Sequence, residues 1–365
     1  MAKSKFYSLT KILEKNAQYN MIIGERSNGK TYSVLKYGVQ KYIETGEQLG
    51  IIRRWRDDFT GKRGSTLFDA LVINGEIEKL SNGEWNNIYY YGGRWFLCRP
   101  DGKGGINRDE NPIAYGFALT SMEHDKSTSY PMITTICFDE FLTRSTYLPD
   151  EFVLFCNTLS TIIRHRDNVK IFMLGNTVNK YCPYFSEMGI SHIKNMQPGN
   201  IDIYRYGDSK LKVAVEYCAT SQKTGGKDSD FYFAFDNPKL TMITGGAWEI
   251  DIYPHCPCKY KPNEILFTYF INFNDELLQC EIINHNDTIF TFIHRKTTPI
   301  KDDNTDIIFT TEYDHRPNHR RKISTPVDNL NRKLYHFYVT DNVYYQDNEV
   351  GEIIRNYLQW CKTES

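Results

Sequence analysis

The sequence lacks the features that carry a chain to or across a membrane. The first 16 residues (MAKSKFYSLTKILEKN) contain no apolar core of the kind that signal peptides have, and no run of about 18 apolar residues occurs anywhere. An excess of positive charge is lacking too, because 44 Lys and Arg residues are balanced by 45 Asp and Glu residues. We therefore expect no membrane partner, and we expect contacts with nucleic acid to be local.

Cysteine is present without the spacing of a disulfide framework or of a zinc site. The nine cysteines are scattered, odd in number and mostly inside apolar runs, which is typical of reduced thiols in a cytosolic protein. His255, Cys256 and Cys258 would supply half of a zinc site, but no second pair stands at a suitable spacing. Reduced thiols are favoured over zinc, and the role of these three residues stays open.

The chain is long enough for two folded cores. It has 365 residues, of which 14% are aromatic. A polar, glycine-containing stretch, Ser221–Ser229, separates a first part in which strand and helix patterns alternate from a second part rich in strand patterns. We predict an α/β domain over residues 1–226, in which about 178–226 form a lid or linker, and a second domain over residues 227–365.

The first domain is organised around a phosphate-binding P-loop, or Walker A motif. GERSNGKT has the spacing G-x-x-x-x-G-K-[ST], and it lies between a predicted strand, Tyr19–Ile23, and a predicted helix, Thr31–Ile43. The glycines allow backbone N–H groups to surround a phosphate, and the helix dipole adds positive charge. An ordinary glycine turn is the alternative. We predict an ATP site in which Lys30 contacts phosphate and Thr31 binds Mg²⁺, formed by Gly24, Glu25, Arg26, Ser27, Asn28, Gly29, Lys30 and Thr31.

Two further predicted strands end in polar residues that suit ATP hydrolysis. Ile133–Phe138 runs into Asp139 and Glu140, which is the Walker B pattern. We predict that Asp139 holds Mg²⁺ and that Glu140 polarises the attacking water, a role that a kinase does not need. The strand Val169–Leu174 is followed by Asn176, which is placed to sense the γ-phosphate. This order of strands indicates an additional-strand, catalytic-glutamate P-loop ATPase.

Arginines follow two other predicted elements. The strand Leu49–Arg53 ends in the basic stretch Arg53-Arg54-Trp55-Arg56. Because the carboxyl ends of strands in an open α/β sheet face the ligand, we favour contact with phosphate or DNA over a solvated turn. The helix Glu151–Arg164 ends in Arg164-His165-Arg166. These cations either stabilise the helix C-terminus or provide an arginine finger for a neighbouring subunit.

The second domain is predicted to be a mostly antiparallel α+β domain. It closes with an amphipathic helix, Val350–Cys361. Two-metal cleavage needs converging carboxylates, and Asp236, Asp251 and Asp275 form no recognisable acidic cluster, so we predict docking without cleavage. The predicted strands are Phe231–Asp236, Ala247–Tyr253, Ile265–Phe273, Leu277–Ile283 and Thr288–His294. The basic candidates for nucleic-acid or portal contact, which could equally form a solvated loop, are Arg316, Arg320, Arg321 and Lys322.

Several of these segments together resemble one family. GERSNGKT, IIRRWR, KSTSYPMITTICFDEF, TIIRHRD, the strand ending in GNT and the closing YYQDNEVGEIIRNYL resemble the genome-packaging (encapsidation) ATPases of small tailed phages whose linear genomes carry a terminal protein. The likeness is firmest over residues 1–180. It implies a homo-oligomeric ring, usually a pentamer, that pumps double-stranded DNA into a procapsid through the portal at the expense of ATP.

The resemblance also implies a location and partners. The ring is expected in the host cytoplasm, transiently at the portal vertex, and not in the mature virion. The second domain is expected to resemble a vestigial ribonuclease-H-like nuclease that sits against the portal protein and, in the best-known members, a structural packaging RNA.

Matching motifs carry individual roles onto this chain. Besides the P-loop and Walker B residues, the resemblance implies that Arg164 is a trans-acting finger and that Lys126 reaches the neighbour's nucleotide. Arg53 resembles an arginine that couples the P-loop to the DNA side, and Arg144 lies in a loop expected to face the pore. Arg56 stands where family members carry Lys, which keeps charge but not geometry. The departures are a glycine-rich insertion around residues 101–109 and a weakly matching linker.

Two other classes of function compete with a motor. A small-molecule or nucleotide kinase would use the same P-loop, although Asp139-Glu140 disfavours it. A nucleotide-gated ring could bind DNA or portal without sustained hydrolysis, although intact Lys30, Asp139 and Glu140 disfavour that too.

Overall fold

The computed structural model describes residues 7–121, 128–144, 147–177, 181–218 and 252–363. The chain divides into two compact units, Met1–Trp248 and Glu249–Ser365, and each is considered by itself. The predicted domain boundary at residues 226/227 lies outside the described residues.

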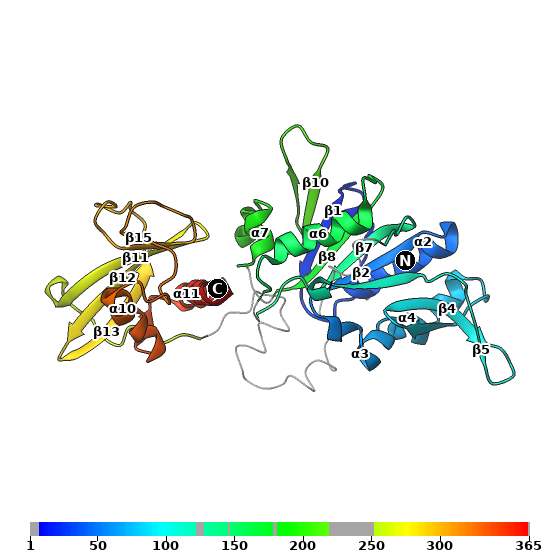
Figure 1. The fold of residues 1–365 in the computed structure, drawn as a ribbon, viewed down its shortest axis with the longest axis horizontal. Coiled ribbons are helices and arrows are strands. Elements are labelled where there is room, and N and C mark those ends of the chain that lie inside the picture. The colour runs from blue at the N-terminus through cyan, green and yellow to red at the C-terminus, as the bar shows by residue number, and fades with distance from the viewer. Residues whose placement is uncertain (1–6, 122–127, 145–146, 178–180, 219–251, 364–365) are drawn as a thin grey trace. The chain divides into compact units, whose positions relative to one another are not determined.

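A ten-stranded sheet forms the first unit (Figure 1), in the order β3-β4-β6-β2-β7-β8-β1-β10-β9, with β5 paired to β4. The strands β2, β7, β8, β1 and β10 run parallel to one another. Four of the five were predicted, and β7 and β8 stand between β2 and β1. Their bounds are β1 Tyr19–Gly24, β2 Gln48–Arg53, β7 Ile133–Asp139, β8 Lys170–Asn176 and β10 Lys212–Tyr217.

The central strands are apolar on both faces because helices cover both. Successive residues of a strand point to opposite faces, so Ile22 and Ile23 belong to different hydrophobic clusters. The helix α2 (Lys30–Thr45) contributes Val34, Leu35 and Val39 to the cluster of Ile22. The helix α6 (Glu151–Ile163) contributes Phe155, Leu159 and Ile162 to the cluster of Ile23. The two helices therefore pack on opposite faces of the sheet.

The long connection between β2 and β7 extends the sheet. It contains a hairpin in which Tyr91 lies opposite Arg94, and Gly92 and Gly93 adopt the positive φ angles that a tight two-residue turn needs. The strand β6 pairs with β2 in parallel. The elements before and within this connection are α1 Thr10–Leu13, η1 Arg56–Phe59, α3 Gly61–Ser65, α4 Asp69–Ile73, α5 Glu76–Leu80, β3 Asn87–Tyr91, β4 Arg94–Pro100, β5 Ile106–Arg108 and β6 Ala114–Ala118.

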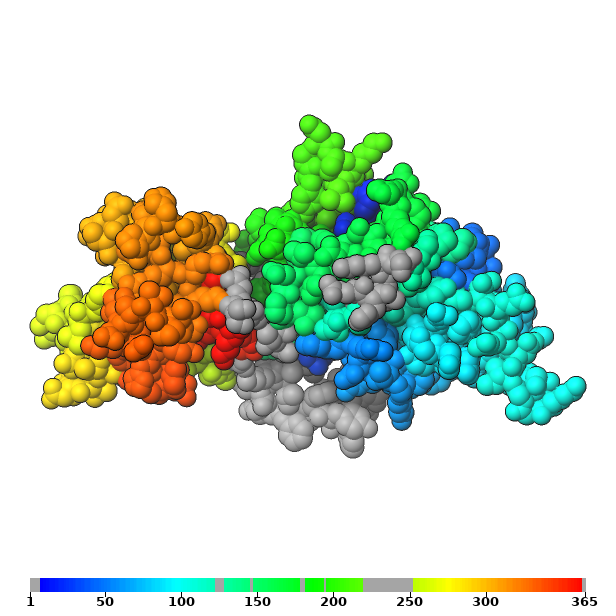
Figure 2. Space-filling model, viewed as in Figure 1, coloured from blue at the N-terminus to red at the C-terminus, as the bar shows by residue number. Residues whose placement is uncertain are grey.

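The segment after β8 contains a strand that the sequence reading missed. The strand β10 pairs in parallel with β1, so this part of the segment predicted as lid or linker belongs to the sheet. It forms an antiparallel pair with β9, and their hairpin projects from the surface (Figures 1 and 2). The other elements here are α7 Pro183–Glu187, η3 His192–Asn195 and β9 Ile201–Arg205.

The second unit holds a six-stranded mixed sheet in the order β15-β14-β11-β12-β13-β16. The three longest strands form an antiparallel meander, as predicted, and three short strands add in parallel at its sides. The predicted strand Phe231–Asp236 and most of Ala247–Tyr253 lie outside the described residues. The elements are η4 Pro262–Glu264, β11 Ile265–Phe273, β12 Glu276–His285, β13 Thr288–Arg295, β14 Ile308–Thr310, β15 His319–Arg320, α10 Asn329–Val339, β16 Val343–Tyr345 and α11 Asn348–Thr363.

The closing helix α11 covers the predicted amphipathic segment. Its residues Val350, Ile353, Ile354 and Tyr357 are buried. Neither this helix nor any other in the described ranges is both long and apolar enough to cross a membrane.

Candidate active site

The two motif glycines at the end of β1 and the start of α2 are required for different reasons. A side chain at Gly24 would place its Cβ 2.9 Å from the Cβ of Cys218, closer than real Cβ atoms come. Gly29 has a φ of +90°, a left-handed conformation that glycine adopts without strain. The helix α2 begins directly afterwards at Lys30. The loop therefore offers backbone N–H groups at a helix N-terminus, the arrangement that binds phosphate elsewhere.

Lys30 is buried and held by the loop itself. Its Nζ donates to the backbone oxygens of Gly24 (3.2 Å) and Glu25 (2.7 Å), and to the side-chain oxygens of Asn28 (3.2 Å) and Asn176 (3.3 Å). Burial lowers the pKa of the ammonium group. All four acceptors are neutral, so an anionic phosphate would be a stronger partner for this cation.

Asp139 joins the loop to two other elements. The Thr31 hydroxyl donates to Asp139 Oδ1 at 3.0 Å, and Arg53 Nη2 donates to Asp139 Oδ2 at 3.0 Å. The parallel order β2-β7-β8-β1 explains this, because the carboxyl ends of these strands share one edge. A hydroxyl and a carboxylate are ligands that Mg²⁺ accepts, so the donor set fits the predicted metal.

Asn176 lies at the same edge of the sheet, at the end of β8, which is the neighbour of the strand that carries Asp139. It is the register partner of Gly24, and the next residue, Thr177, donates its backbone N–H to the Gly24 oxygen at 3.2 Å. Because Asn176 accepts a hydrogen bond from Lys30, the predicted sensor contacts the residue that is predicted to bind phosphate.

Glu140 follows Asp139 in a turn with unusual backbone geometry. Its φ is +59°, which is uncommon for a residue other than glycine, and its side chain is exposed. Non-glycine residues in this region persist only where their surroundings hold them, and they gather at functional sites.

Arg54 supplies part of those surroundings, which the sequence did not reveal. It is buried, and it binds both carboxylate oxygens of Glu151 at 2.7 Å. The structure therefore does not support the predicted contact between Arg54 and DNA. In the sequence, Arg54 resembles its neighbours in a basic turn, and Glu151 resembles an ordinary acidic residue at a helix start, so neither carried a distinguishing signal.

Arg164 ends α6 at the opposite edge of the sheet. The first residue of the helix, Glu151, lies near the end of β2, whereas Arg166 donates to the backbone oxygen of Ile133 at the start of β7. Arg164 is exposed and donates to the Thr128 oxygen at 2.9 Å. A 13-residue helix spans roughly 20 Å, so Arg164 lies far from the P-loop of its own chain. Lys126 lies outside the described residues.

Two other arginines were predicted to face DNA or a pore. Arg56 is exposed in η1, and Arg144 is half-buried in the segment after β7. Arg166, in contrast, donates to the backbone oxygens of Tyr130, Pro131 and Ile133, and also to those of Ile162 and Ile163.

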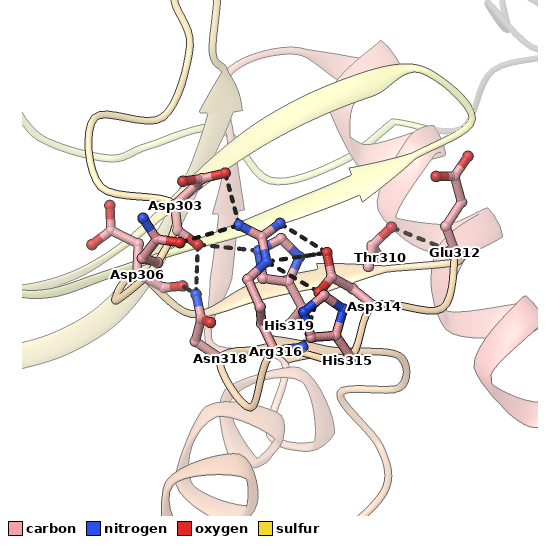
Figure 3. Close-up of polar contacts among 10 residues, drawn as sticks. Asp303, Asp306, Thr310, Glu312, Asp314, His315, Arg316, Asn318 and His319 are labelled. Atoms are coloured by element: carbon pink, nitrogen blue, oxygen red, sulfur yellow. Dashed lines mark hydrogen bonds and ion pairs between the residues drawn. The ribbon is translucent and has the colours of Figure 1, made fainter.

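In the second unit, the basic candidates contact other residues of the chain, and Figure 3 shows those of Arg316. Arg316 lies between Asp303 (3.0 Å) and Asp314 (2.8 Å) and holds the pKa of Asp314 well below its usual range. Arg320 pairs with Asp328 at 2.8 Å. The side chains of Arg321 and Lys322 lie over the Trp360 ring.

Three aspartates of the second domain were predicted to form no metal-binding cluster of the kind that a nuclease needs. Asp275 lies in the turn between β11 and β12, while Asp236 and Asp251 are outside the described residues. Among the residues that the structure describes, no group of three or more His, Cys, Asp or Glu side chains is placed to hold a metal ion. Absence of cleavage stays a prediction.

Relatives of this chain are named for DNA packaging. It is 30% identical over 188 residues to the DNA packaging protein of Bacillus phage phi29, covering 51% of this chain and 50% of the relative. It is 30% identical over 174 residues to that of Bacillus phage B103, covering 47% and 48%. The chain thus spans about half the length of the curated relatives it matches.

Solved structures share the fold along nearly the whole chain. The bacteriophage Phi-29 viral genome packaging motor assembly matches with a TM-score of 0.56 and 20% identity, covering 97% of each chain. The Phi-28 gp11 DNA packaging motor matches with a TM-score of 0.56 and 16% identity, covering 99% of this chain and 100% of that one. Residues 1–205 match the family model described as podovirus DNA encapsidation protein (Gp16). The chain belongs to this podovirus DNA encapsidation protein family.

Proposed function

We propose that this protein is an ATP-driven motor that moves double-stranded viral DNA into a preformed procapsid. The observation that carries the proposal is the meeting of three elements at one sheet edge, where Thr31 contacts Asp139 and Lys30 contacts Asn176. Membership of the encapsidation family supplies the setting.

In this proposal, the chain's residues divide the work of ATP hydrolysis. The loop Gly24–Thr31 binds the phosphates, with Lys30 exchanging its loop acceptors for phosphate oxygens. Mg²⁺, held by Thr31 and Asp139, would neutralise phosphate charge when bound. Glu140 orients and polarises the attacking water, and Asn176 senses the γ-phosphate.

A neighbouring subunit completes the site. Since Arg164 lies at the sheet edge opposite Lys30, it suits another subunit's nucleotide better than its own. Lys126 is a second candidate, because Arg164 contacts Thr128, two residues along the chain. This geometry supports a homo-oligomeric ring, for which we propose a pentamer.

DNA and the portal are the partners we propose. Arg53, Arg56 and Arg144 are candidates for the DNA side, Arg53 through its contact with Asp139. The second unit is proposed to dock on the portal protein, and on a structural RNA where one is used. Its meander of three antiparallel strands, extended in parallel by β14 and β15, supports a ribonuclease-H-like origin. The ring would act in the host cytoplasm, transiently at the portal vertex, and would be absent from the mature virion.

ATP turnover, measured with and without double-stranded DNA, tests the proposal. Lys30→Ala should abolish tight ATP binding, because Lys30 contacts the phosphates already in the ground state. Glu140→Gln should keep ATP binding and lose hydrolysis, because Glu140 acts on the water. Unchanged turnover in Glu140→Gln would remove it from the base role. A phosphorylated acceptor would indicate a kinase, and nucleotide-dependent DNA binding without turnover would indicate a gated ring.

A further inference from the structure

One buried arginine holds the turn that carries Glu140. Arg54 Nη1 donates to the backbone oxygen of Glu140 at 3.2 Å, and Nη2 donates to that of Phe141 at 2.9 Å. The same guanidinium binds both oxygens of Glu151 and lies over the Tyr147 ring at 5.2 Å. The N–H groups of this one guanidinium therefore bind both the Glu140–Phe141 turn and the first residue of α6.

The partner carboxylate is fixed as firmly as the arginine. Glu151 also accepts from the Leu148 backbone N–H at 2.8 Å and from the Tyr184 hydroxyl at 2.9 Å. Its side chain is fully buried. A buried ion pair of this kind is rarely needed for stability, since well-packed apolar residues often serve equally well. Its presence here calls for another role.

The geometry of the turn indicates that role. Glu140 has a left-handed backbone conformation that is uncommon for a non-glycine residue, and Arg54 binds the carbonyl oxygen of that same residue. The backbone of Glu140 sets the direction in which its side chain leaves the turn, so a fixed carbonyl limits the positions that the carboxylate can reach. Displacement of a catalytic group by about 1 Å costs on the order of 100-fold in rate.

We propose that Arg54, anchored by Glu151, is a positioning residue for the catalytic base Glu140. The inference rests on the proposed function, in which Glu140 activates water. In this proposal Arg54 acts on the reaction through the backbone of Glu140, and contact with ATP or with the attacking water is not part of its role.

Arg54→Lys tests this, because lysine keeps the charge and loses the fork. We expect ATP affinity close to wild type and turnover reduced by about 100-fold. The matched control is Tyr184→Phe, which removes one hydrogen bond to the same Glu151 but keeps the ring that packs against Phe141 and leaves every donor of Arg54 in place; its turnover should stay near wild type. Equal losses of turnover in both variants, in proportion to lost thermal stability, would overturn the inference.

A double variant separates this inference from the proposed function. If Arg54 acts through Glu140, then adding Arg54→Lys to Glu140→Gln should bring no further loss of turnover. If the double variant loses turnover by the product of the two single-variant factors, the two residues act independently and the positioning role is overturned. If Glu140→Gln alone keeps its turnover, the assignment of the base fails instead.

A further double variant tests the inference if the Arg54→Lys protein does not fold. Arg54→Met with Glu151→Leu replaces the ion pair by apolar side chains of similar size. This protein should fold and still show the roughly 100-fold lower turnover. Turnover near wild type would show that the pair only stabilises the fold.

Discussion

Single residues at the site differ in how much the sequence reveals about them. Lys30, Thr31, Asp139 and Asn176 could be predicted because motif spacing and the ends of buried strands mark them. Arg54 could not, since neighbouring arginines in one turn look alike and only the fold decides which is buried. The same holds for the left-handed backbone of Glu140, which depends on contacts made after folding.

The lowered pKa of Lys30 predicts proton uptake when ATP binds. Burial favours the neutral amine in the free protein, whereas phosphate charge favours the ammonium. ATP affinity should therefore fall as pH rises through the pKa of the free protein. Calorimetry over a series of pH values below the ordinary lysine pKa, in two buffers of different ionisation enthalpy, measures the uptake. Lys30→Arg, which stays protonated, should show none. Equal uptake in both proteins would place the titrating group elsewhere.

At the scale of elements, apolar periodicity predicted the strands that carry the site. It failed for β10, where Lys212–Tyr217 lies beyond a stretch broken by Pro183, Pro198 and Gly199. In the sequence such a segment resembles a linker, because it is pairing with β1 that makes it a strand. In the second unit, the short strands β14, β15 and β16 were missed because two or three residues are too few to show an alternation of apolar and polar side chains.

The mixed sheet of the second unit is predicted to cut no DNA. Supercoiled plasmid incubated with the full-length protein and Mg²⁺ or Mn²⁺ should stay supercoiled, because two-metal cleavage requires converging carboxylates. Electrophoresis of the plasmid measures this. Metal-dependent nicking that disappears in Asp236→Asn or Asp275→Asn would contradict it, and nicking that persists in both would indicate a contaminating nuclease.

At the scale of the whole molecule, helix α6 connects two sites. Its first residue, Glu151, binds Arg54 beneath the Glu140 turn, and its end carries Arg164 at the opposite sheet edge. In a ring, one rigid helix would thus link a subunit's own catalytic turn to its neighbour's nucleotide.

Mixed rings test the contribution of Arg164. Arg164→Ala and Glu140→Gln proteins should each be nearly inactive, since a trans-acting finger contributes about 10³–10⁵ in rate where it is known. Mixed together, they should regain part of the ATPase activity, because an Arg164→Ala subunit keeps Glu140 and receives its neighbour's finger. If rings that demonstrably contain both proteins show no recovery, Arg164 caps the helix and Lys126 becomes the better candidate.

The central claim is that ATP hydrolysis at the Lys30–Glu140 site moves DNA into a procapsid. The most direct measurement is protection of double-stranded DNA from added nuclease in the presence of cognate procapsids. Wild-type protein with ATP should protect full-length DNA, whereas Glu140→Gln with ATP, and wild type with a non-hydrolysable analogue, should protect none. Equal protection by wild type and Glu140→Gln would contradict the account.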